Sequence, residues 1–283
     1  MLPRLLNIFS LGIFQSLGRL LLSFFKLIEG VGARVIFLWQ VIVKIWKRPF
    51  EVREFIIQLY LVGVRSLPIV GVSGFFVGGI VALQFDYALD LFGAGVYLGG
   101  VTTSGLLREV GPVLVAIMIT GRIGAFIAAE LGTIKVTGQT EAIRCLGLEP
   151  MQVLVVPRFL AVVIMIFLLT IFGLLVSLVG GALVSFFILD VSISYYLVYL
   201  LKLTTAWAFL NGIIKSFIFG ILVGIISCYE GYNAEPGAEG VGRAVNRTLV
   251  YASIVVFLTD YIVAAIASLT FTLAQEIVFP FGS

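Results

Sequence analysis

The feature that most limits how this chain can fold is a run of 31 residues, from 159 to 189, without a charged side chain. A helix needs about 20 apolar residues to cross the hydrocarbon core of a bilayer, so this run is long enough to span a membrane. The rest of the chain has the same character, since 61% of the 283 residues are hydrophobic and 12% are charged. A soluble domain carries about 25% charged residues to cover its surface. The sequence therefore predicts an all-α integral membrane protein.

Other apolar stretches suggest further spans. We predict five transmembrane helices within a single domain over residues 49–283, at about 55–84, 105–129, 151–188, 204–229 and 247–275. Small residues recur at every fourth position of two of them: Gly212, Ser216, Gly220, Gly224 and Cys228 in the fourth, and Gly173, Ser177, Gly181 and Ser185 in the third. Gly71, Gly74 and Gly78, spaced three and four residues apart, lie on one face of the first. Such stripes let helix backbones approach closely, chiefly within one chain.

Residues 1–48 carry charges but no long apolar run. At 3.6 residues per turn the charges fall within about 140° of the helix circumference, and the rest is apolar. They are Arg4, Arg19, Lys26, Glu29, Arg34, Lys44, Lys47 and Arg48. This pattern is typical of a helix lying in the membrane interface, which Pro49 would end and which Gly30 and Gly32 would divide.

The short connections predict the orientation of the chain. Lys and Arg gather before the first span, in the second-to-third connection and in the fourth-to-fifth connection, whereas the segments 85–104 and 189–203 hold only Lys202. The positive-inside rule then places the N-terminus in the cytoplasm and the C-terminus outside. The net charge of +3 therefore reflects membrane topology rather than nucleic-acid binding.

Ionisable residues inside the predicted spans are the main functional signal. A charge at the centre of a span costs about 2.5–3.5 kcal/mol on insertion scales, so it faces a partner or a cavity. We expect Arg108, Glu109 and Lys215 to line one outward-facing cavity. A structural ion pair such as Glu109–Lys215 is the alternative, and the two are compatible. Asp260 is interpreted as a helix–helix contact.

The connection after the second span contains a short predicted helix. Thr137 would cap its start, Glu141 and Arg144 lie three residues apart, and Gly147 with Pro150 would end it. Such a helix could dock a soluble partner or simply connect two spans. The later segment Glu230–Arg247, rich in glycine, reads as a polar loop.

The sequence contains none of the usual catalytic groups. There are no histidines, the two cysteines Cys145 and Cys228 cannot build a disulfide framework, and no glycine-rich nucleotide-binding loop is present. We therefore expect no metal, no cofactor and no enzymatic activity in this chain itself.

Several motifs resemble one known family, the MlaE/YrbE permeases, which are the membrane subunits of MCE-associated lipid ABC transporters. The resemblance covers about residues 50–275 and is carried by the runs 107–112 (LREVGP), 121–137 (GRIGAFIAAELGTIKVT), 156–158 (VPR), 230–234 (EGYNA) and 237–244 (GAEGVGRA). Gly138 stands where the family often has an acidic residue. Glu230 and Asn233 replace the usual Asn and Asp.

The resemblance implies a homodimeric permease of the bacterial inner membrane. It implies two cytoplasmic ATPase subunits that bind ATP and magnesium, an MCE-domain protein on the outer side, and phospholipid as the cargo. Arg108, Glu109 and Lys215 would form the polar end of the lipid cavity. The helix at 137–147 would be the coupling helix, contacting the ATPase through Thr137, Gln139, Glu141, Arg144 and Gly147.

Two other classes remain open. A gradient-driven secondary transporter could use Glu109, Lys215 and Asp260 as a relay, but it should show internal repeats or broken half-helices. A permease for polar nutrients would need more polar residues within its spans.

Overall fold

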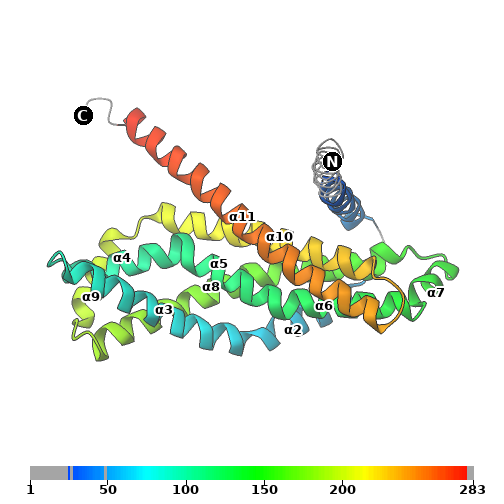
Figure 1. Ribbon diagram of the computed structural model, residues 1–283, viewed down its shortest axis with the longest axis horizontal. Helices are drawn as coiled ribbons and strands as arrows, with labels where there is room; N and C mark the ends of the chain where they lie inside the picture. Colours follow the sequence, from blue (N-terminus) through cyan, green and yellow to red (C-terminus); the bar gives the residue numbers. More distant parts are fainter. Residues whose placement is uncertain (1–24, 26–27, 48–49, 279–283) are drawn as a thin grey trace, which may run out of the picture. The chain divides into compact units, whose positions relative to one another are not determined.

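The computed structural model describes residue 25, residues 28–47 and residues 50–278, and it divides the chain into two compact units between Lys47 and Arg48 (Figure 1). In the first unit, residues 28–45 form one helix that continues through Gly30 and Gly32, so the predicted division there is wrong. Arg34 donates a hydrogen bond of 2.9 Å to the Gly30 carbonyl, and a glycine inside a helix costs only about 1 kcal/mol. The remainder of the predicted interfacial helix and its end at Pro49 lie outside the described residues.

The second unit contains five helical segments long and apolar enough to cross a membrane, which confirms the predicted fold class. They cover Val52–Asp90, Gly95–Val136, Met151–Phe187, Trp207–Tyr232 and Ala238–Thr270. Their α-helices are α2 (Val52–Val62), α3 (Leu67–Asp90), α4 (Leu98–Gly105), α5 (Gly111–Ile119), α6 (Ala125–Val136), α8 (Val156–Phe187), α10 (Ala206–Tyr232) and α11 (Ala238–Val278). The short helices α7 (Gln139–Cys145) and α9 (Ile193–Leu203) lie at opposite ends of the bundle (Figure 1).

Most interruptions of the spans lie where a proline removes a backbone donor. A 3₁₀ turn (Val64–Ser66) separates α2 from α3, which has Pro68 in its first turn. A π-helical turn at Leu106–Val110 precedes Pro112, and another at Met151–Val155 precedes Pro157. A third π-helical turn, Thr120–Gly124, separates α5 from α6. Proline lacks the N–H that continues a helical ladder, so local adjustments of this kind are expected beside it.

Two connections that the sequence left as loops are largely helical. The segment 85–104 holds the end of α3, a 3₁₀ turn (Gly95–Tyr97) and most of α4, and the segment 189–203 holds α9. Gly99 makes the α4–α9 contact possible, because a Cβ there would lie 2.3 Å from the carbonyl oxygen of Tyr196.

The predicted loop Glu230–Arg247 is also mostly helical, since α10 extends to Tyr232 and α11 begins at Ala238. Within the short turn that remains, the Glu235 carboxylate pairs with Arg243 at 2.6 Å and with Arg247 at 3.1 Å. These ion pairs join the turn to the first turns of α11, and they explain why a polar, glycine-containing segment is ordered.

The stripes of small residues pack within the chain, as expected. A Cβ at Gly78 of α3 would lie 1.8 Å from the Ser177 carbonyl oxygen of α8, and a Cβ at Gly74 would lie 2.8 Å from that of Gly173. In α10, a Cβ at Gly220 would lie 3.0 Å from the Val163 carbonyl oxygen. Helix α8 therefore packs backbone to backbone against both α3 and α10.

Candidate functional site

The first site centres on Lys215 of α10, whose side chain is fully buried. Its ammonium nitrogen lies 2.6 Å from Oε2 of Glu109 and 2.8 Å from Oδ1 of Asp260 on α11. It also donates a hydrogen bond of 3.0 Å to the backbone carbonyl of Arg108. Lys215 of α10 therefore joins α11 and the π-helical turn that holds Arg108 and Glu109. Asp260 makes an interhelical contact, as expected, and it does so through an ion pair.

The local sequence explains how Lys215 reaches this carbonyl. In an α-helix the carbonyl of Arg108 would accept from the N–H of residue 112, but that residue is proline and has no N–H. Gly212 lets α10 come close, because a Cβ there would lie 2.5 Å from the carbonyl oxygen of Leu107. The lysine ammonium thus replaces a donor that the helix lacks.

Arg108 and Glu109 also line a groove of about 440 Å³, beside α4 and α9. The other lining residues are Phe85, Gly100, Val101, Ser104, Gly105 and Leu203. The sequence placed Lys215 on the same wall, but it lies behind Glu109, with no exposed surface. The predicted ion pair between Glu109 and Lys215 is therefore present, whereas the groove is lined by Arg108 and Glu109 and not by Lys215.

Charge balance distinguishes the two groove residues. The Glu109 side chain is 44% exposed, and its carboxylate is already paired with Lys215. Within the described part of the chain, the Arg108 guanidinium has no carboxylate within ion-pair distance. Because no carboxylate of the described residues forms an ion pair with it, the Arg108 guanidinium is the group on this wall best suited to an anionic ligand.

The second site is α7, the short helix predicted from the sequence. Gln139, Glu141 and Arg144 are exposed on it. Gly147, with φ of +76°, follows its end as a left-handed cap. The pKa of the Glu141 carboxyl lies below its ordinary value because a backbone N–H at the helix start and the Lys135 ammonium both donate to it.

The predicted role of Thr137 as the cap of α7 is wrong. Its hydroxyl donates to the carbonyls of Thr133 and Ile134, and it therefore closes the end of α6. The residue before α7 is Gly138, with φ of +74° and no side chain to cap the helix. The other two departures from the family pattern lie at the end of α10. Glu230 is buried there, and Asn233, the residue after the helix, donates to the Tyr229 carbonyl.

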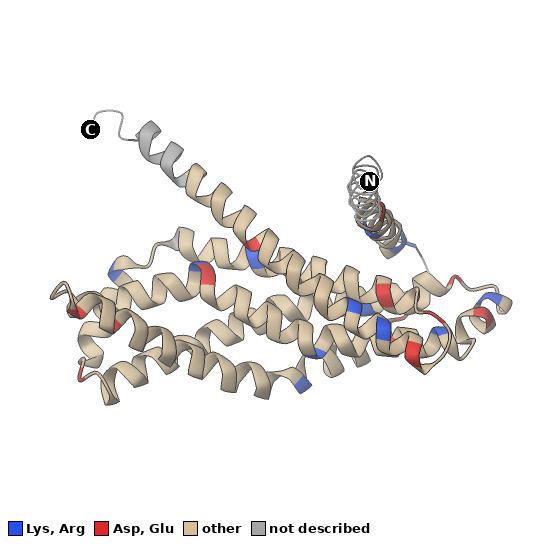
Figure 2. Ribbon diagram, viewed as in Figure 1, with Lys and Arg blue, Asp and Glu red and all other residues tan. Residues whose placement is uncertain are grey.

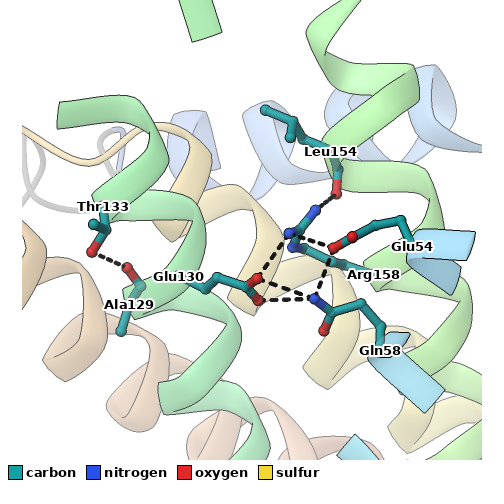
Figure 3. Close-up of polar contacts among 7 residues, drawn as sticks. All are labelled: Glu54, Gln58, Ala129, Glu130, Thr133, Leu154 and Arg158. Carbon is teal, nitrogen blue, oxygen red and sulfur yellow. Dashed lines mark hydrogen bonds and ion pairs between the residues drawn. The ribbon is translucent and has the colours of Figure 1, made fainter. Parts of the chain in front are cut away.

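Sequence reasoning missed a second buried charge cluster, near the α7 end of the bundle. Arg158 of α8 is 3% exposed, and its guanidinium pairs with Glu54 of α2 at 2.7 Å and with Glu130 of α6 at 2.8 Å (Figure 3). Gln58 donates to both carboxylates at 3.1 Å. The available signal was the four-residue spacing of Glu54 and Gln58, which places both on one helix face.

Charged side chains are sparse along most of the helices and are more frequent towards the α7 end (Figure 2). Among the described residues, no three histidine, cysteine, aspartate or glutamate side chains are arranged to hold a metal ion. The arrangement therefore consists of one open groove with a charged wall, one closed charge cluster and one exposed short helix.

Comparison with known proteins identifies the family. Residues 55–266 match the family described as Permease MlaE. The chain belongs to this family. A probable ABC transporter permease protein of Rickettsia felis is 35% identical over 253 residues, which cover 89% of this chain and 96% of that protein.

Two other relatives carry more specific names. The intermembrane phospholipid transport system permease protein MlaE of Haemophilus influenzae is 36% identical over 210 residues, covering 74% of this chain and 80% of that protein. The chloroplastic protein trigalactosyldiacylglycerol 1 of Arabidopsis thaliana is 31% identical over 226 residues, covering 80% and 65% respectively. The chain is thus a multi-pass membrane protein and the permease component of an ABC-type transporter.

Proposed function

We propose that this chain is the permease subunit of an ATP-driven phospholipid transporter, and that the groove beside Arg108 and Glu109 holds the polar end of the lipid. The observation that carries the proposal is the Arg108 guanidinium on the groove wall, which forms no ion pair with any described residue and lies directly beside the buried Lys215 pair. A phosphate group is the anion that such a guanidinium binds well, through paired N–H donors. The neighbouring Phe85, Val101 and Leu203 supply apolar surface for the acyl chains.

The proposal extends to the assembly. Two copies of the chain would pack so that their grooves form one outward-facing cavity. Two cytoplasmic ATPase subunits, which bind ATP and magnesium, would contact α7 through Gln139, Glu141 and Arg144, in the segment between Thr137 at the end of α6 and the turn at Gly147. An MCE-domain protein would bind at the α9 end of the permease. The permease would lie in a bacterial inner membrane, with its N-terminus in the cytoplasm.

The test is native mass spectrometry of the protein extracted gently from its own membrane. The proposal predicts a complex with two permease chains and two ATPase chains that releases phospholipid on activation. A single permease chain with neither ATPase nor retained lipid would contradict it.

One observation favours a second candidate function. Glu109, Lys215 and Asp260 form a continuous chain of ion pairs, as a gradient-driven transporter would need for a proton or ion relay. Reconstituted vesicles separate the two possibilities. Lipid movement that needs ATP supports the ABC transporter, whereas movement that follows an imposed pH gradient without ATP supports the relay.

A further inference from the structure

The buried cluster of Glu54, Gln58, Glu130 and Arg158 has no role in the groove, and its geometry links three spans at one level. Arg158 lies on α8, Glu130 on α6, and Glu54 with Gln58 on α2 (Figure 3). One guanidinium nitrogen of Arg158 contacts both carboxylates, and the other donates to the Leu154 carbonyl at 2.8 Å. We call this set the clamp.

The position of the clamp in the chain gives it a specific relation to α7. Helix α6 leads through a short turn into α7, and the chain returns through the π-helical turn Met151–Val155 into α8. Glu130 therefore lies on the segment that leads to α7, and Arg158 lies on the segment that returns from it. The 2.8 Å contact between Glu130 and Arg158 holds together the two segments that flank α7.

The chemistry of the clamp restricts movement between these two segments. Arg158 is 3% exposed and Gln58 is 1% exposed, whereas the Glu54 and Glu130 side chains are 31% and 27% exposed, so the cation is enclosed and its carboxylate partners are half-buried. Removing one partner from a buried charge pair leaves an uncompensated charge and is strongly unfavourable. A tilt of α6 relative to α8 would break the contact between Glu130 and Arg158, whereas α2 would keep its own contact with Arg158.

We propose that the clamp is a positioning device that transmits movement between α7 and the transmembrane helices, so that ATP hydrolysis by the partner drives lipid movement. This inference rests on the proposed function, because it assumes that α7 contacts an ATPase. Glu130 and Arg158 act through α7 and touch neither lipid nor nucleotide.

The cluster provides a matched pair of variants for the test. Glu130→Gln cuts the charge pair between α6 and α8 and leaves Arg158 paired with Glu54. Glu54→Gln makes the same chemical change and leaves the pair between α6 and α8 intact. The two ion pairs are similar in length, at 2.8 and 2.7 Å, so a purely structural role predicts similar losses from both variants.

The first readout is lipid transported per ATP hydrolysed by the assembled complex in vesicles. We expect Glu130→Gln to lower this ratio roughly tenfold, within the usual range for coupling between distant sites, and Glu54→Gln to change it less than about twofold. Equal ratios in the two single variants would overturn the proposal.

A second readout needs only the permease. Cys145 is exposed on α7 and Cys228 is buried, so a thiol-reactive fluorophore should label α7. The proposal predicts that the label becomes more mobile in Glu130→Gln and not in Glu54→Gln, and unchanged mobility in both would overturn it. If the wild-type complex moves no lipid, the proposed function fails, whereas this measurement still tests the clamp.

Discussion

The two buried charge clusters are built alike and differ in what surrounds them. Each places one cation between two carboxylates from other segments, and each lies beside a π-helical turn followed by proline, Pro112 in one case and Pro157 in the other. The Lys215 cluster borders a groove, and its Glu109 is 44% exposed. In the clamp around Arg158 the cation is 3% exposed, the Glu54 and Glu130 side chains are 31% and 27% exposed, and Gln58 donates to both carboxylates.

The choice of cation fits this difference. The arginine side chain presents a rigid planar fork that fixes several partners at once, whereas the lysine ammonium is a compact point charge on a flexible stem. In the clamp, the Arg158 fork holds Glu54 and Glu130 at once. The Lys215 ammonium reaches two carboxylates and a backbone carbonyl from behind the groove wall, on which Arg108 is the cation.

The largest expected effect is on stability, from Arg158→Ala. This change leaves two carboxylates at the clamp without their cation, and breaking a buried pair in this way costs about 3–5 kcal/mol. We expect Lys215→Ala to cost less, because Glu109, at 44% exposed, can be hydrated at the groove once its cation is lost, although Asp260, at 19% exposed, is more enclosed than Glu54 or Glu130. Unfolding of the two variants in the same detergent measures the difference, and a larger loss for Lys215→Ala would refute the distinction.

A substitution that forces α3 and α8 apart tests whether lipid binding in the groove depends on helix packing elsewhere in the bundle. Gly78→Ala places a Cβ 1.8 Å from the Ser177 carbonyl oxygen, so the helices must separate, and overpacking of this kind costs about 1–3 kcal/mol. Gly71→Ala is the matched control, since its nearest contact is an ordinary 3.5 Å to the ring of Phe172. In the Gly78 variant, lipid binding per folded molecule should stay unchanged. A fall in lipid binding that exceeds the loss of folded protein would mean that the groove depends on the packing of α3 against α8.

Removing the free guanidinium should affect the groove alone. We expect Arg108→Ala to lower phospholipid binding about tenfold, as for a lost charge-assisted hydrogen bond, with little change in unfolding temperature. Alanine at Glu109 or Lys215 should also reduce transport while the protein still folds. Arg122→Ala is the control, because Arg122 does not line the groove. Equal retention of lipid by the Arg108 and Arg122 variants would argue against a role for Arg108.

The smallest effect is the pH dependence of α7. Because folding lowers the pKa of Glu141 from its ordinary value of 4.5, this carboxylate stabilises α7 above that pH, and the stabilisation is lost as pH falls through the lowered value. The mobility of a label on Cys145 should therefore rise at acidic pH. Lys135→Gln should move this rise to higher pH, because it removes one of the donors that lower the pKa. A rise at the same pH in both proteins would show that Lys135 does not contribute.

Hydropathy predicted the spans well because membrane insertion depends on the composition of each segment. It failed for α4 and α9, which are positioned by a close approach of Gly99 to Tyr196, a contact between residues far apart in sequence. Glu109 and Lys215 could be singled out because charges inside spans are rare. Their arrangement, with Asp260 as a further partner and Lys215 behind the wall, depends on tertiary packing that the sequence does not display.

The clamp was missed for a related reason. Arg158 lies just before the longest charge-free run, where a basic residue is usually interpreted as part of the connection that flanks a membrane span. Its partners are supplied by α2 and α6, and only the folded chain brings these together. Thr137 was misassigned because a threonine before a short helix is typical of a cap, whereas here it bonds backwards to α6.

Photo-crosslinking from within the groove shows directly whether it holds a phospholipid. A photoreactive amino acid is placed at Val101, on the groove wall, and separately at Phe76, which is 62% exposed on α3. Each position is tested in the native membrane with and without Arg108→Ala. The account predicts a phospholipid adduct at Val101 that is largely lost with Arg108→Ala, and an adduct at Phe76 that does not change. An adduct at Val101 that persists unchanged without Arg108 would contradict the claim that this groove binds the polar end of a phospholipid.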